Sequence, residues 1–194
     1  MIPAGYMYKR VSERPDWLNS AQVDDIYSVS GCISNDFDDW VSYWKHNGYW
    51  LFDTPQVIEA IAADNQISLA DMTLFFYEVY ELQWDDDARQ WGPFAPEASF
   101  GTHVQAPQRA TLEGFDVTSF STQNSAECSP LSCNHMAAEI AVNRHCLVNS
   151  LEAAKALVEA GAFDGCEPGP YRIFAVYRVE RGPAGQAAGG AEGA

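Results

Sequence analysis

The sequence predicts an α+β fold, a mostly antiparallel β-sheet with three or four short helices packed on one face of it. Two observations support this class. Helical and strand-like segments are mixed along the chain without the regular alternation that parallel sheets require. The last apolar segment, YRIFAVYRV at 171–179, has β-branched and aromatic residues on both faces, as an interior strand does.

The chain length of 194 residues suits a single domain. We expect that domain to cover residues 1–180, because the stretch at 181–194 is rich in alanine and glycine and has no apolar periodicity. Such a stretch buries too little surface to offset the entropy of ordering it, so the sequence predicts a disordered tail. No internal repeat is evident in the sequence.

The first predicted element is a short helix over NDFDDWVSYWKHNG, residues 35–48. Asn35 can cap its N-terminus, and Gly48 is placed to end it. Four apolar residues recur at three- and four-residue spacing and therefore share one face: Phe37, Trp40, Val41 and Trp44. A short buried strand is expected at 49–52. Pro55 then predicts the first turn of a second helix.

The segment 69–84 is ambiguous between helix and strand. Its aromatic and aliphatic residues alternate loosely from Leu74 to Trp84, and this alternation favours a long strand. The aspartates at 85–87 then predict an acidic turn, and a returning strand is expected at 89–94.

The second half of the chain predicts a strand at 112–121, a short helix at 134–140 and a short strand at 145–148. Asn149 begins a stretch that resembles a capping box, so a helix is expected from there to Gly161.

The chain carries 27 acidic and 11 basic residues, which gives a formal net charge of −16. Such a surface repels nucleic-acid phosphates and anionic lipids, so we expect no direct binding of nucleic acid or membranes. It suits a partner protein with a basic surface. The acids form runs at 24–25, 36–39 and 85–87.

The first ten residues, MIPAGYMYKR, lack the apolar core of a signal peptide, and no apolar run reaches membrane-spanning length. We therefore expect a cytoplasmic protein whose thiols stay reduced. The chain has five cysteines, and because this number is odd they cannot all pair in disulfides.

Three of the cysteines and two of the histidines lie within SAECSPLSCNHMAAEIAVNRHCLV, residues 125–148. Cys128 and Cys133 have the spacing of a zinc-binding pair. His135 and Cys146 could complete four ligands, since thiolate and imidazole suit tetrahedral zinc. Zinc is the one cofactor that the sequence suggests.

The same stretch could instead carry a thiol nucleophile, which needs a histidine within hydrogen-bond reach. We favour Cys133 with His145, because a helix beginning just after Cys133 would lower the pKa of its thiol. In a third interpretation, which we prefer, the stretch is an ordered loop whose buried cysteines act as small hydrophobes.

The familiar phosphate-, dinucleotide- and zinc-protease motifs are absent from the sequence. Together with the charge, this absence favours a binding protein of inhibitor or immunity type that engages a basic or nucleic-acid-binding site on its partner. The expected contact residues are Asp36, Asp38, Asp39, Asp85, Asp86 and Asp87, with Trp50 as an aromatic anchor. The alternative is a Cys/His-dependent enzyme, such as a thiol hydrolase or transferase, or a zinc-binding protein that uses residues 128–146.

Overall fold

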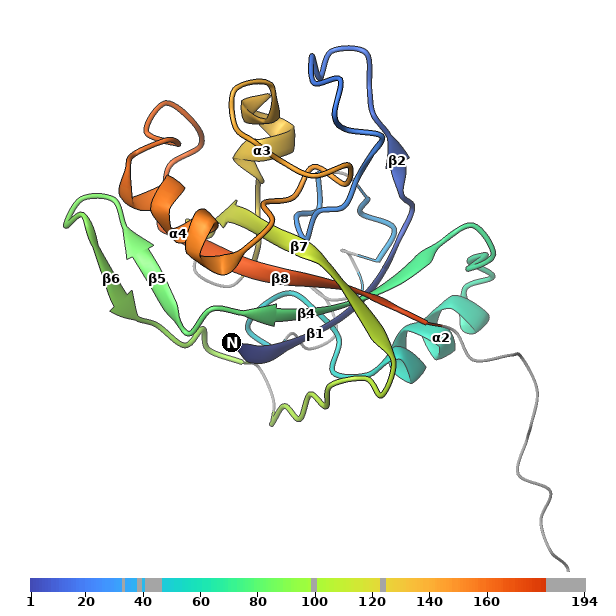
Figure 1. The fold of residues 1–194 in the computed structure, drawn as a ribbon. Helices are drawn as coiled ribbons and strands as arrows, with labels where there is room; N and C mark the ends of the chain where they lie inside the picture. Colours follow the sequence, from blue (N-terminus) through green and yellow to red (C-terminus); the bar gives the residue numbers. More distant parts are fainter. Residues whose placement is uncertain (33, 38–39, 41–46, 99–100, 123–124, 181–194) are drawn as a thin grey trace, which may run out of the picture.

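The computed structural model describes residues 1–32, 34–37, 40, 47–98, 101–122 and 125–180 (Figure 1). The tail at 181–194 and most of the helix predicted at 35–48 lie outside these residues. Within them the predicted α+β class is confirmed, because an antiparallel sheet of six strands is combined with short helices. None of the described helices is long and apolar enough to cross a membrane.

Six strands make up the main sheet: β1 (Ile2–Lys9), β4 (Thr73–Val79), β5 (Leu82–Asp85), β6 (Gln90–Pro93), β7 (Ala110–Ser119) and β8 (Tyr171–Val179). Its central order is β1-β4-β8-β7, and the β5–β6 hairpin joins β8 through Trp84 and Tyr171. Strand β8 has partners on both sides, which confirms the predicted interior strand. A second, small sheet pairs β2 (Ser12–Glu13) with β3 (Asp25–Ile26).

Helix α2 (Pro55–Asp64) begins where the sequence places it, and α4 (Leu151–Glu159) begins one residue later than predicted. Helix α2 follows Thr54 as N-cap, with proline in its first turn as predicted. Helix α4 is capped by Ser150, whose side chain accepts a hydrogen bond from the backbone of Ala153. The predicted cap, Asn149, lies one residue too early, because the hydroxyl of Ser150 is the group that reaches the free backbone donor.

The helix predicted at 134–140 is wrong. Helix α3 (Pro130–Cys133) precedes that range and is four residues long, and η1 (Met136–Ala138) is a single 3-10 turn. Pro130 favours the first turn of a helix, while His135 between the two pieces has a φ of 65°, which no continuous helix permits. Cys133 is therefore the last residue of a helix, so a helix N-terminus cannot lower its pKa.

The strand predicted over 74–84 is two strands, because the chain leaves the ladder between β4 and β5 at Tyr80. There the Tyr80 carbonyl accepts a hydrogen bond from the buried guanidinium of Arg172. The strands predicted at 49–52 and 145–148 are irregular segments, each joined to a sheet edge by one bridge. Strand β1 was not among the predicted elements.

The chain folds as two copies of one unit. The first consists of β1, a loop that returns to the outer edge of β1, helix α2 and β4. The second consists of β7, a loop that returns to the outer edge of β7, helix α4 and β8 (Figure 1). In each unit the first strand pairs antiparallel with the last. The two loops also cover edges that would otherwise be open to aggregation.

The loops attach to their strands by the same contacts. The Asn47 amide donates to the Ala4 carbonyl at 2.6 Å, and the Asn143 amide donates to the Glu113 carbonyl at 2.7 Å. Each acceptor lies in a bulge next to a glycine of positive φ, Gly5 or Gly114. Each asparagine oxygen also accepts two backbone N–H groups of its own loop.

The two units are related by an approximate two-fold axis through the sheet. Gly5 pairs with Tyr77 in the first unit, and Gly114 pairs with Val176 in the second. Tyr77 and Val176 also pair with each other across β4 and β8. The axis passes between these two residues. Because such an axis is perpendicular to the sheet, equivalent residues of the two units lie on the same face.

Helices α2 and α4 lie on one face of the sheet, and irregular segments pack on the other. The Tyr8 hydroxyl donates to Glu59 of α2, and the two-fold relation puts α4 on that same face, against β7 and β8. On the other face, the ring of Phe75 packs on Tyr27 and that of Phe174 on Tyr49. This second face is therefore covered by irregular segments, and those segments carry the cysteines described next.

Candidate functional site

Three cysteines from distant parts of the chain meet on the loop-covered face. The sulfurs of Cys32, Cys128 and Cys133 all lie within 4.8 Å of one another. Cys32 is exposed, Cys133 is half-buried and Cys128 is buried, so the cluster has one side open and one side closed. In the described part of the chain, this is the group of ligand atoms whose spacing suits a metal ion.

Local structure aims two of the thiols at each other. Cys128 directly precedes Ser129, the N-cap of α3, and Cys133 ends the same helix one turn later. The backbone N–H of Cys133 donates to the Ser129 carbonyl at 2.8 Å, which holds the turn closed. The Cys32 thiol comes from the other segment and donates to the Glu127 carbonyl at 3.3 Å. The Cys32 sulfur is thus positioned by a backbone contact, and Cys128 and Cys133 are brought close by the helical turn between them.

The thiols shift one another's pKa. Hydrogen bonds from Cys128 and Cys32 lower the pKa of Cys133, although burial acts in the opposite sense. The same bonds raise the pKa of Cys128, with burial adding to the effect. The ionisations of the three thiols are therefore coupled, and ionising all three sulfurs needs a cation to compensate the charge.

A buried carboxylate lies behind the cluster. Asp116 on β7 is fully buried, and its two oxygens contact different segments. One oxygen accepts from the Ser28 hydroxyl at 2.7 Å and the Val29 N–H at 3.0 Å. The other accepts from the Ser129 hydroxyl at 2.6 Å. Asp116 thereby links the segment that leads to Cys32 with the segment that carries Cys128 and Cys133.

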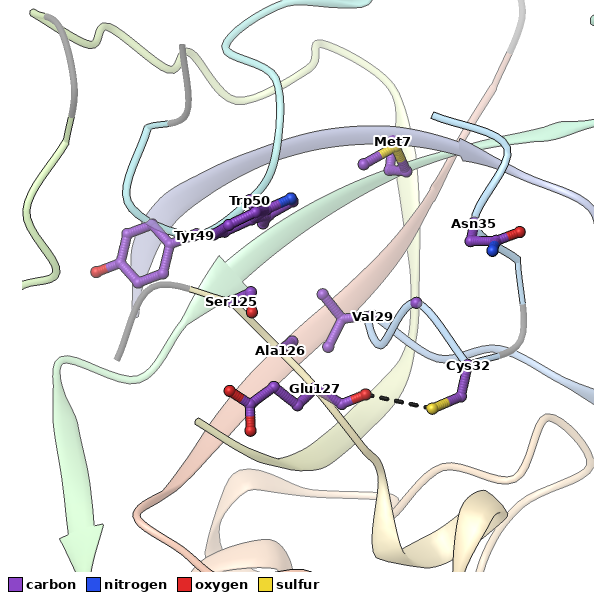
Figure 2. A pocket seen from close by; sticks show the side chains of 10 residues that line it. Met7, Val29, Cys32, Asn35, Tyr49, Trp50, Ser125, Ala126 and Glu127 are labelled. Atoms are coloured by element: carbon purple, nitrogen blue, oxygen red, sulfur yellow. Dashed lines mark hydrogen bonds between the residues drawn. The ribbon is translucent and has the colours of Figure 1, made fainter. Parts of the chain in front are cut away.

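A hollow of about 420 Å³ adjoins Cys32. Figure 2 shows Trp50 and Met7 on one side of it, with Val29 and Ala126 across from them and Cys32 at one end. The Glu127 carboxylate points away from Cys32 in this view. It accepts hydrogen bonds from Ser121 and Thr122, which outweigh burial and lower the pKa of Glu127. Trp50, the predicted anchor, lines the hollow.

The structure brings together two of the four predicted metal ligands, Cys128 and Cys133, and adds Cys32. Cys146 is 2% exposed, and burial raises the pKa of its thiol to about 12, with the charges of Asp116 and Cys133 acting the same way. His135 is exposed, and its ring lies 4.7 Å from that of Trp17. Neither belongs to the cluster within the described residues.

The predicted Cys133–His145 pair is not brought together. The Nδ1 of His145 lies 2.5 Å from Asp25, and its Nε2 lies 3.6 Å from Glu113. The imidazole also stacks on Tyr27, with the ring centroids 4.1 Å apart. Both ring nitrogens of His145 therefore face carboxylates, and neither one makes a hydrogen bond to Cys133.

The predicted acidic contacts lie in separate places. Asp36 pairs with Arg10, which directly follows the C-terminal end of β1. That end of β1 lies beside the start of β4. The aspartates at 85–87 form the β5–β6 turn, beyond the other end of β4. Asp38 and Asp39 lie outside the described residues. The two runs are therefore at opposite ends of the sheet as far as the structure describes them.

Cys32 is the site residue that sequence reasoning missed. It lies far from the crowded stretch at 125–148, in a segment without a metal-ligand spacing of its own. Cys32 reaches Cys128 and Cys133 because residues 28–30 cross the sheet, and no local sequence pattern predicts that crossing.

Comparisons with protein-family models, with curated proteins and with solved structures find no match for this chain.

Asp116 makes a pH-dependent contribution to stability that can be measured. Burial raises its pKa from 3.8 to about 6, partly offset by the hydrogen bonds from Ser129, Ser28 and Val29. A carboxyl group with a raised folded-state pKa stabilises the protein fully below pH 4 and loses that effect as the pH rises through 6. The shift corresponds to about 3 kcal/mol.

We therefore expect the free energy of unfolding of the wild type, relative to Asp116→Asn, to fall by up to about 3 kcal/mol between pH 4 and pH 7. Urea unfolding of both proteins at several pH values measures this difference. Parallel pH profiles for the two proteins would contradict the assignment.

Proposed function

We propose that this protein binds a thiophilic metal ion, with zinc as the first candidate, through Cys32, Cys128 and Cys133. The observation that carries the proposal is the approach of three sulfurs to within 4.8 Å of one another. Sulfurs around a tetrahedral zinc ion, each about 2.3 Å from the metal, lie about 3.8 Å apart. Small side-chain rotations would bring the three thiols to that spacing.

The electrostatics of the cluster support a cation. Three neighbouring thiolates repel one another, and a divalent ion removes that repulsion as it displaces the protons. The lowered pKa of Cys133 favours the loss of its proton to an incoming ion. The reducing compartment expected for this chain keeps all three thiols available.

Three protein ligands leave one coordination position for an outside molecule, as in catalytic rather than structural zinc sites. The hollow beside Cys32 offers room for such a molecule, and its walls combine Trp50 and Tyr49 with the polar side chain of Asn35. We propose that the metal presents its free position on this side. The site then takes a small ligand from the hollow.

Titration with Co²⁺ tests the proposal directly. Protein purified with reductant and without chelator should bind one equivalent and show the intense sulfur-to-cobalt charge-transfer absorption of thiolate ligands. Zn²⁺ should abolish this absorption by displacing the cobalt. Protein that shows no thiolate absorption and carries no zinc by native mass spectrometry would refute the proposal.

We also propose a second function, the binding of a partner protein with a basic surface. The observation that favours it is the β5–β6 turn, where three consecutive aspartates line a hollow of about 320 Å³ with Pro168, Gly169 and Pro170. Capture of a partner from the source cell should weaken steeply with added salt. A variant with asparagine at 85–87 that captures the same partner equally well would refute this function.

A further inference from the structure

We infer that Lys9 and Asp116 are positioning residues of the three-thiol site, and that together they hold Ser28–Ser30 so that Cys32 reaches Cys128 and Cys133. This inference rests on the proposed metal-binding function. It concerns which residues give the site its geometry, and neither of the two residues belongs to the cluster itself.

Lys9 holds the segment from one side. Its side chain, on β1, is 3% exposed, and its ammonium group donates to the Val29 carbonyl at 3.0 Å and to the Ser30 carbonyl at 2.5 Å. Burying an ammonium group is costly unless its hydrogen bonds are made, so these two carbonyls must stay close to it. The chain then reaches Cys32 after one more residue.

Asp116 holds the same segment from the other side. It accepts the Val29 N–H and the Ser28 hydroxyl, and Ser28 also lies 3.0 Å from the hydroxyl of Ser30. The peptide groups on both sides of Val29 are thus held by buried side chains of opposite charge. Because Asp116 also binds Ser129, the carboxylate fixes the distance between the two cysteine-bearing segments.

Comparison of the two units shows that the positions of Lys9 and Asp116 each carry a charged residue in only one of them. The residue equivalent to Asp116 in the first unit is Met7, which makes no such bridge and lines the hollow instead. Lys9 corresponds in the same way to Thr118. The two units share their edge contacts and differ at the positions that hold Ser28–Ser30.

Disulfide trapping tests the inference without a metal. Diamide accepts two electrons and two protons from a pair of thiols, so brief exposure should join Cys32 to Cys128 or Cys133 in the wild type, as peptide mass mapping would show. In Lys9→Met, we expect these Cys32 bonds to form about tenfold more slowly, while the Cys128–Cys133 bond forms at its normal rate.

Asp116→Asn should slow the Cys32 bonds as well, and both variants should bind Co²⁺ about 10- to 100-fold more weakly, as loss of an outer-sphere partner does. Lys155→Met and Asp164→Asn provide matched controls, because Lys155 donates to the Tyr80 hydroxyl and Asp164 accepts from Arg89, away from the cluster. Both controls should behave as the wild type.

Ser28→Ala removes one hydroxyl from the network, and it provides the test if either charge variant fails to fold. Its Cys32 bonds should form about threefold more slowly. Trapping rates equal to the wild type in the folded variants would overturn the inference. A wild type that traps Cys32 readily but binds no cobalt would refute the metal function and leave the positioning role standing.

Discussion

Replacing Cys32 by serine should weaken Co²⁺ binding by about 100-fold or more. Structural zinc sites with four ligands bind with about 10–16 kcal/mol, so each ligand contributes about 3 kcal/mol, which is roughly 100-fold in affinity. Serine keeps the size of the side chain but its hydroxyl is a poor ligand for a thiophilic ion. The measurement is a competition titration against a chromophoric chelator.

Cys128→Ser and Cys133→Ser should cause losses of the same order, because the three sulfurs form one cluster. Cys166→Ser is the matched control, since this cysteine is half-buried like Cys133 and lies outside the cluster. The control should retain wild-type affinity and the full charge-transfer absorption.

The same series separates the observed cluster from the ligand set that the sequence suggests. That set includes Cys146 and His135 and omits Cys32. If Cys146→Ser or His135→Ala abolished cobalt binding while Cys32→Ser left it unchanged, the ligand set read from sequence spacing would be correct. The cluster seen in the structure would then not be the metal site.

The parts of the fold that the sequence predicts correctly have local causes. Helix α2 follows from Pro55 at its first turn, and β8 follows from an apolar run with both faces buried. Each signal lies within about ten residues of the element that it predicts. The α+β class follows from such elements because their order along the chain excludes regular alternation.

The site could be predicted only in part, because its geometry is not local. Cys128 and Cys133 are brought together by one turn of helix, and their spacing shows this in the sequence. Cys32 joins them through contacts of Ser28–Ser30 with β1 and β7. The partners in these contacts, Lys9 and Asp116, are ordinary charged residues in the sequence, and their burial is visible only once the sheet has formed.

The internal repeat escaped detection for a similar reason. The equivalent loops, NGYWLF at 47–52 and NRHCLV at 143–148, share only the asparagine and the leucine. The asparagine is retained because its amide makes the edge contact, whereas the other positions meet different neighbours. The repeat is therefore visible in the backbone geometry of the two loops, although their side chains differ at most positions.

Gly114→Ala should destabilise the protein by about 3 kcal/mol or more, through backbone strain and a steric clash together. Gly114 has a φ of 151°, and an added methyl carbon would lie 2.7 Å from the Cβ of Leu147 and 2.9 Å from the Val148 carbonyl oxygen. The clash falls on the loop that covers the edge of β7. Urea unfolding monitored by tryptophan fluorescence measures the loss.

Gly5→Ala should cost about as much, because its methyl carbon would lie 2.7 Å from the Cβ of Leu51 and 2.8 Å from the Phe52 carbonyl oxygen, at a φ of 141°. Gly92→Ala is the control. It lies on β6 with nothing within 4 Å of the added carbon, so its stability should change by less than about 0.5 kcal/mol. A Gly114→Ala loss as small as that of the control would contradict the proposed strain.

The double variant gives the strictest test of the two-unit fold. Its two sites belong to different strands and different loops, so their effects should add to about 6 kcal/mol or more. A domain of this kind is stable by only about 5–15 kcal/mol, so the double variant should be largely unfolded or close to it. A loss much smaller than the sum would mean that the two edges are not independent, and that one loop can leave its strand without the fold being lost.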